Sequence, residues 1–252
     1  MRSIHFLVAA ALIASGFGQL AQADEKQAQA IVAKAIQAIG GEAKLAKAKA
    51  ISWKTKGTLH FGDNANKYTA QATVAGLDKF RQEFEGEFGG NQVKGVVVLD
   101  GDKGWRSFGD MSMELDQEAV ANEKRTVYLQ AIGSASLLPL KTAAFKIETA
   151  EDGKAGDADA AGVKVTAPDG KDFTIYFDKQ SNLPVKVVAK VVGFDGQEFT
   201  QETVYSEFKD FDGVKKATKL QSKRDGQVFI DAELVEFKTL DEVADDAFAE
   251  PK

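Results

Sequence analysis

Asp-Gly pairs divide the chain into short segments, and this spacing restricts its possible folds more than any other feature. The sequence contains six of them: Asp100-Gly101, Asp152-Gly153, Asp169-Gly170, Asp195-Gly196, Asp212-Gly213 and Asp225-Gly226. Asp-Gly suits a two-residue turn between antiparallel strands because both central positions of that turn adopt positive φ. Short turns between successive strands predict an antiparallel meander, without the crossovers that parallel strands need.

Alternation of apolar and polar residues predicts about eleven strands between these turns. In residues 78–88, Phe80, Phe84 and Phe88 share one face, whereas charged residues occupy the other. One apolar and one polar face is typical of an antiparallel sheet that covers a core on one side only. The expected strands are residues 51–61, 67–76, 78–88, 93–99, 143–149, 162–167, 171–178, 183–193, 197–211, 216–224 and 227–238.

Two segments follow the period of a helix. Residues 25–39 carry apolar side chains at helical spacing and end at Gly40-Gly41, as expected of a helix C-terminus. A second approximate stripe covers residues 115–132 and ends at Gly133. The small and polar residues 153–162 predict a flexible surface loop.

The N-terminus has the pattern of a cleaved secretory signal peptide. Arg2 precedes an apolar run over residues 6–14, and Ala21-Gln22-Ala23 provides a small-x-small cleavage site. The alternative, a membrane-spanning helix, needs roughly 20 apolar residues, and this run is shorter. We therefore expect a signal peptide over residues 1–23 and a single domain over residues 24–252. Because the chain has no cysteine, we expect a periplasmic or secreted protein without a lipid anchor.

The composition excludes several kinds of chemistry. Without cysteine there are no disulfides and no thiol catalysis, and His60 is the only histidine outside residues 1–23. Removing Arg2 with those residues changes the net charge from −6 to −7, which argues against a nucleic-acid partner. Asp100, Asp102, Asp157 and Asp159 lie in turn-like segments without the spacing of a calcium loop. We expect no metal, no cofactor, no catalytic residues and no enzymatic activity.

A sheet with one apolar face must cover that face. The sheet can curl over the helical segment 115–132, and such a curved sheet can either enclose an apolar cavity or have a filled core. The residue pattern favours neither outcome over the other.

The order of features resembles the LolA-like superfamily of lipoprotein-sorting and lipid-carrier proteins. After the helix that ends in Gly-Gly, residues 96–105 are similar to its apolar strand, Asp-Gly turn and Trp. Residues 176–185 are similar to its Phe-Asp…Leu-Pro hairpin, residues 205–214 to its Tyr…Asp-Phe…Gly strand, and residues 241–248 to its closing segment. Residues 75–81 lack the Arg-Pro pair of the sorting factor itself, which favours a relative with a similar pocket over a true lipoprotein chaperone.

The resemblance implies an open half β-barrel, mainly antiparallel, curled over a helical plug. It implies a soluble monomeric carrier for a lipid or the acyl chains of a lipoprotein, with envelope membrane proteins as further partners. Phe80, Phe84, Phe88 and Trp105 are the expected wall of the apolar cavity, although each could equally belong to a filled core. The alternative function is a non-catalytic structural or interaction module of the envelope with such a core.

Overall fold

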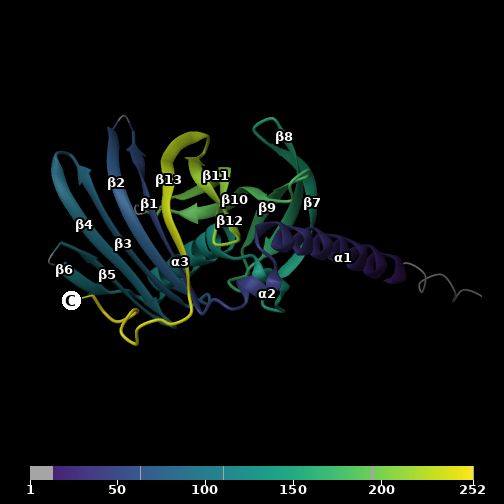
Figure 1. The fold of residues 1–252 in the computed structure, drawn as a ribbon, viewed down its shortest axis with the longest axis horizontal. Coiled ribbons are helices and arrows are strands. Elements are labelled where there is room, and N and C mark those ends of the chain that lie inside the picture. Colours follow the sequence, from purple (N-terminus) through teal and green to yellow (C-terminus); the bar gives the residue numbers. More distant parts are fainter. Residues whose placement is uncertain (1–13, 63, 110, 194–195, 252) are drawn as a thin grey trace, which may run out of the picture.

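Thirteen antiparallel strands form a single open sheet in the part of the chain that the structure describes (Figure 1). The structure is a computed structural model that describes residues 14–62, 64–109, 111–193 and 196–251, with side chains from residue 22 onward except that of Ser134. The strands are β1 (Ala50–Phe61), β2 (Asn64–Ala75), β3 (Lys79–Phe88), β4 (Asn91–Asp100), β5 (Lys103–Phe108), β6 (Met111–Glu114), β7 (Lys146–Ala155), β8 (Ala158–Thr166), β9 (Asp172–Asp178), β10 (Pro184–Val192), β11 (Glu198–Phe211), β12 (Val214–Arg224) and β13 (Gln227–Leu240).

The sheet consists of two meanders joined along one strand pair. The spatial order is β6-β5-β4-β3-β2-β1-β13-β12-β11-β10-β9-β8-β7. Each strand therefore lies beside its neighbours in the chain, except where β1 pairs with β13. The edges are β6 and β7, and the chain passes between them through the helical segment after β6. The predicted open, unclosed antiparallel sheet is thus confirmed.

Helices cover one face of the sheet, which we call the concave face. They are α1 (Ala14–Ile39), α2 (Glu42–Leu45), α3 (Gln117–Gln130), a π-helical turn η1 (Ala131–Ala135) and a 3₁₀ turn η2 (Leu138–Lys141). In Figure 1 the helix α3 lies between the two halves of the sheet, and α1 packs mainly against β7. Buried residues of α1, α3 and η1 belong to the same core cluster as those of the strands.

The predicted N-terminal helix is present and ends where expected. Ala28, Val32, Ala35, Ile36 and Ile39 repeat at helical spacing and are buried. The amide of Gly41, at φ 83°, donates to the carbonyl of Ile36 and terminates the helix. The helix begins at Ala14, within the expected signal peptide, but residues 1–13 lie outside the described residues. The signal peptide and the single domain over 24–252 therefore stay predictions.

Two local predictions were wrong. The expected eleven strands are thirteen, because β5 and β6 were not anticipated: all four residues of β6 are exposed, so it has no apolar alternation. The flexible loop over 153–162 is instead a hairpin formed by the ends of β7 and β8. Two of its glycines lie where a side chain has no room: a Cβ on Gly153 would lie 2.6 Å from the Tyr176 ring, and one on Gly162 would lie 2.5 Å from the Glu151 carbonyl.

None of the described helices is long and apolar enough to cross a membrane. No group of three or more His, Asp or Glu side chains in the described part of the chain is arranged to hold a metal ion.

Candidate functional site

Helix α3 is fixed across the concave face by polar contacts at both ends of the sheet. Its N-cap is Asp116, whose carboxylate accepts a hydrogen bond of 2.8 Å from the amide of Ala119. On the β6 side, Glu123 pairs with Arg106 of β5, and Lys124 donates to Asp102 over 2.7 Å. These contacts hold the helix against the first meander.

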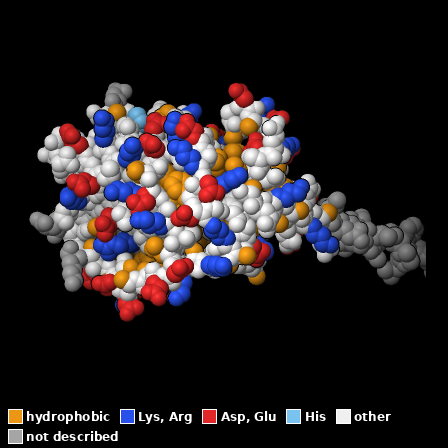
Figure 2. Space-filling model, in the orientation of Figure 1, with side chains coloured by type: hydrophobic (Ala, Val, Ile, Leu, Met, Phe, Trp, Pro, Cys, Tyr) orange, Lys and Arg blue, Asp and Glu red, His pale blue; other side chains and the backbone are white. Residues whose placement is uncertain are grey.

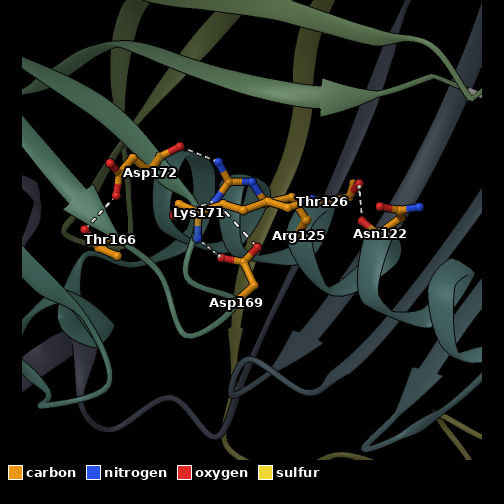
Figure 3. Close-up of polar contacts among 7 residues, drawn as sticks. All are labelled: Asn122, Arg125, Thr126, Thr166, Asp169, Lys171 and Asp172. Carbon is orange, nitrogen blue, oxygen red and sulfur yellow. Dashed lines mark hydrogen bonds and ion pairs between the residues drawn. The ribbon is translucent and has the colours of Figure 1, made fainter.

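Arg125 ties α3 to the second meander (Figure 3). Its guanidinium donates to the carbonyls of Lys171 at 3.2 Å and Asp172 at 2.6 Å, and lies 3.7 Å from the Asp169 carboxylate. Burial lowers the pKa of Arg125, and the negative charges of the Asp169 and Asp172 carboxylates oppose that effect. Because Arg125 and Glu123 engage opposite halves of the sheet, α3 acts as a bridge over the concave face.

A cavity of about 190 Å³ lies beside this bridge, between η1 and the middle of the sheet. Strands from both meanders contribute to its wall, together with the end of α3. The apolar lining includes Trp53, Leu129, Ile132, Leu137, Val187, Ala189, Leu220, Ile230, Ala232 and Leu234. The polar lining includes Thr55, Tyr68, Gln82, Gln130, Gln201, Thr203, Tyr205, Lys216 and Ser222.

Two pairs of polar side chains in the lining bond to one another. The hydroxyls of Thr203 and Ser222 are buried and lie 2.8 Å apart. Burial raises the pKa of Tyr68 to about 12, and its hydrogen bond with Thr55 opposes that rise. The wall is therefore apolar with a few hydroxyl and amide groups, which is the mixed lining of many small-molecule sites.

Lys216 is the one lysine among the buried residues of the described chain. Its ammonium donates to the carbonyl of Ala135 in η1 and lies 4.9 Å from the centre of the Phe237 ring. Burial lowers the pKa of Lys216 to about 7, because the surrounding medium solvates the charged form poorly. Near pH 7 the amine in the cavity wall is therefore present in both its protonated and its neutral form.

The four side chains expected to form the cavity wall are not together. Phe80, Phe84 and Phe88 share the concave face, and Phe80 is only 1% exposed, within the core cluster. Cross-strand pairing places Trp105 beside Val98, on the opposite face of the sheet. None of the four contributes to the lining of the 190 Å³ cavity. Ligand contact by Phe80, Phe84, Phe88 and Trp105 stays a prediction.

Phe84 and Phe88 instead belong to an aromatic rim near the strand ends. The ring centroids of Phe84 and Phe108 are 5.5 Å apart, and those of Phe88 and Phe61 are 6.4 Å apart. Phe61 and Phe108 are 44% and 39% exposed. In Figure 2, hydrophobic side chains show at the surface among the charged ones.

The lining residues were not predicted because the strand pattern does not distinguish aromatic residues that line the cavity, such as Trp53 and Phe208, from those elsewhere in the sheet. A usable signal was present for Lys216: with Val214 and Thr218 it falls on the face of β12 that alternation assigns to the core, and all three are buried. A lysine at a core-facing strand position is rare unless its charge is paired.

Comparison with known proteins identifies relatives by structure alone. No family model and no curated protein matches the sequence. A LolA superfamily protein from Nitrosomonas europaea superposes with a TM-score of 0.58 at 13% identity, over 88% of this chain and 97% of its own. The chain has the LolA-like fold.

Two further solved structures share this LolA-like fold. A domain from Vibrio parahaemolyticus, assigned to outer membrane lipoprotein sorting, has a TM-score of 0.54 at 9% identity, over 89% of this chain and 97% of its own. A DUF1329 family protein from Desulfovibrio piger has a TM-score of 0.53 at 10% identity, over 88% and 96% of the two chains. The resemblance stated from the sequence is therefore confirmed at the level of the fold.

Proposed function

We propose that this protein is an exported, non-enzymatic carrier that holds a lipid or the acyl chain of a lipoprotein in the cavity beneath η1. The observation behind the proposal is the cavity itself, which lies between the helical bridge and the middle of an open curved sheet. The likeness to a domain assigned to lipoprotein sorting agrees with it. In this proposal, membrane proteins of the envelope donate and accept the cargo.

The size of the cavity sets a condition on binding. A cavity of roughly 150 Å³ accommodates benzene, whereas pockets for larger ligands span roughly 300–1,000 Å³. The present volume of about 190 Å³ therefore holds only part of a long acyl chain. Loading a whole chain requires the wall to move.

The segment from η1 to η2 is the part of the wall expected to move. Helix α3 is held by the buried Arg125 and by Glu123, as described above. The η2 turn, by contrast, is tied to α2 by the exposed pair of Lys141 with Glu42. Exposed ion pairs contribute little to stability, so the main cost of displacing residues 131–141 is the exposure of the buried side chains of Ile132, Leu137 and Leu140.

The test uses a neutral fluorescent probe, N-phenyl-1-naphthylamine, and mass spectrometry of lipid extracted from the purified protein. Ala189 is buried in the lining, and Ala189→Leu fills part of the cavity. We expect this variant to lose probe binding, whereas Ala158→Leu, at an exposed strand position, retains it. Ala232→Leu, at a second position of the lining, replaces the first variant if far-UV circular dichroism shows that Ala189→Leu does not fold.

Absence of both extracted lipid and probe binding in the wild-type protein would overturn the proposal and favour the envelope interaction module. Export has its own test. Mass spectrometry of the protein recovered from outside the cytoplasm should show Asp24 at the N-terminus, and an intact Met1 would contradict cleavage after Ala23.

A further inference from the structure

Lys216 occupies a position in β12 where a charge is costly. Its neighbours along the strand, Lys215 and Lys219, are exposed, as lysines normally are. Lys216 itself is 7% exposed and forms part of the cavity wall. An ammonium group taken out of water requires an opposite charge or several hydrogen bonds to offset the lost hydration.

The contacts of Lys216 do not supply that compensation. Its ammonium carries three N–H donors, and the Ala135 carbonyl accepts from one of them. The Phe237 ring adds a cation–π contact. No carboxylate of the described residues lies within ion-pair distance of this ammonium.

The other buried basic residue provides a comparison within the same fold. The guanidinium of Arg125 is bound by two backbone carbonyls and lies near the Asp169 carboxylate. The two terminal nitrogens of Arg125 therefore have partners within the protein, including a carboxylate, although its buried Nε has no hydrogen-bond partner among the described residues. Lys216 lines a cavity instead, and an anion that enters the cavity can provide its missing partner.

We propose that Lys216 binds the anionic head group of a single-chain amphiphile, with the hydrocarbon chain lying in the cavity beneath η1. The two sources of this chemistry are the carboxylate of a free fatty acid and the phosphate monoester of a single-chain lipid. This inference rests on the proposed carrier function and narrows its cargo, because the acyl chains of a lipoprotein are linked through uncharged esters and amides.

The geometry accommodates such a head group without dismantling the present contact. Because two further N–H donors remain on the ammonium, it can keep the Ala135 carbonyl and bind an anion as well. The hydroxyls of Thr203 and Ser222 lie in the same lining. The apolar remainder of the wall, including Leu220 and Val187, suits the chain.

The experiment compares three ligands of equal chain length: dodecanoate, monododecyl phosphate and methyl dodecanoate. Each displaces N-phenyl-1-naphthylamine from the wild-type protein, from Lys216→Met and from Lys146→Met. We expect the wild type to bind at least one anion roughly 10- to 100-fold more tightly than the ester, since hydrogen bonds to charged groups contribute that much. The anion that binds more tightly identifies the source of the head group.

In Lys216→Met the preference for the anion should fall to less than threefold while ester binding stays unchanged. Lys146→Met, which alters an exposed lysine outside the cavity lining, should match the wild type. If the wild-type protein binds the ester as tightly as both anions, Lys216 has no part in recognition although the carrier function stands. If none of the three ligands displaces the bound probe, the head-group assignment fails, whereas the carrier function fails only if the wild-type protein binds neither the probe nor extracted lipid.

A measurement on the wild-type protein avoids dependence on the variants. With dodecanoate labelled at its C2 methylene, nuclear Overhauser contacts to the Lys216 side chain are expected in the complex. Contacts from the labelled methylene to the rim residues Phe61 or Phe88 alone would place the head group outside the cavity and overturn the assignment.

Discussion

Replacing Lys216 with Met should raise the stability of the unliganded protein by an amount that depends on pH. Burial lowers the pKa of this lysine from 10.5 to about 7. At 1.36 kcal/mol for each pH unit of that difference, protonating the buried amine costs the native state about 4–5 kcal/mol relative to the unfolded chain. Met keeps a similar unbranched shape and removes the charge.

The sign of the pH dependence follows from which state binds the proton. Between pH 7 and pH 10.5 the unfolded chain keeps a proton on this lysine and the native state does not, so stability rises with pH. The whole penalty is present below pH 7 and vanishes above pH 10.5. Between pH 7 and pH 10 the free energy of unfolding of the wild type should therefore rise by about 3 kcal/mol more than that of Lys216→Met.

At pH 7 the net gain of the variant is smaller than the penalty it removes. The Ala135 carbonyl loses its donor, and a buried group left without a partner costs about 1–3 kcal/mol. We expect Lys216→Met to be more stable than the wild type by about 1–4 kcal/mol at pH 7. Urea unfolding at pH 7, 8.5 and 10 measures both quantities, with Lys146→Met, which alters an exposed lysine outside the cavity, as the control. Parallel pH profiles for the wild type and Lys216→Met would refute the reasoning.

The remaining predictions concern packing and the anchoring of α3. Phe80→Ala should lower the free energy of unfolding by about 3–5 kcal/mol, because the side chain is 1% exposed; a loss below about 1 kcal/mol in urea unfolding would contradict its place in the core. Arg125→Met should lower the free energy of unfolding by about 2–4 kcal/mol, since two carbonyls and Asp169 lose a buried donor. Amide hydrogen exchange should then become faster in α3 than in the sheet, and a uniform increase would argue against a local anchor. Gly57→Ala, in β1, should lower the melting temperature, because the new Cβ would lie 2.2 Å from the carbonyl of Asp231 in β13. An unchanged midpoint in calorimetry would show that β1 and β13 can move apart to accept the methyl group.

The Asp-Gly pairs predicted the topology because the conformation of a two-residue turn is set locally. At Asp212-Gly213 and Asp225-Gly226 both residues have positive φ, between 46° and 84°, and each pair joins adjacent strands. Asp152-Gly153 misled the prediction because it lies inside β7, next to the register shift between Ala150 and Gly153. The dipeptide favours positive φ in a turn, but it does not distinguish a turn from a bulge.

The pairing of β1 with β13 has no comparable local signal. The two strands lie at opposite ends of the sheet sequence, and their contact joins the two meanders along ten residue pairs, with one shift between Lys54 and Thr55. Each strand alone shows only that one of its faces is apolar. Which distant strand completes the sheet depends on how both meanders pack on α1 and α3, which is a property of the whole core.

The location of the cavity follows from where the sequence places its small side chains. Phenylalanine marks filled parts of the concave face: Phe80 in the first meander and Phe173 and Phe177 in the second are 1–3% exposed. The cavity lies between these parts, where the short side chains of Ala189 and Ala232 leave space above the sheet. Gly133 lets η1 approach there, since a Cβ on it would lie 2.5 Å from the Tyr205 hydroxyl.

Phe80, Phe173 and Phe177 mark where the helices seal the sheet, but the cavity wall also contains aromatic residues: Trp53, Tyr68, Tyr205 and Phe208. Aromatic residues alone therefore did not reveal the site. The position of Lys216 is more specific, because the strand face that carries it continues through Thr218, Leu220 and Ser222 along the cavity. A charged residue at a core-facing position among small neighbours is the sequence pattern that indicates such a site, because there a ligand can supply the missing partner of the charge.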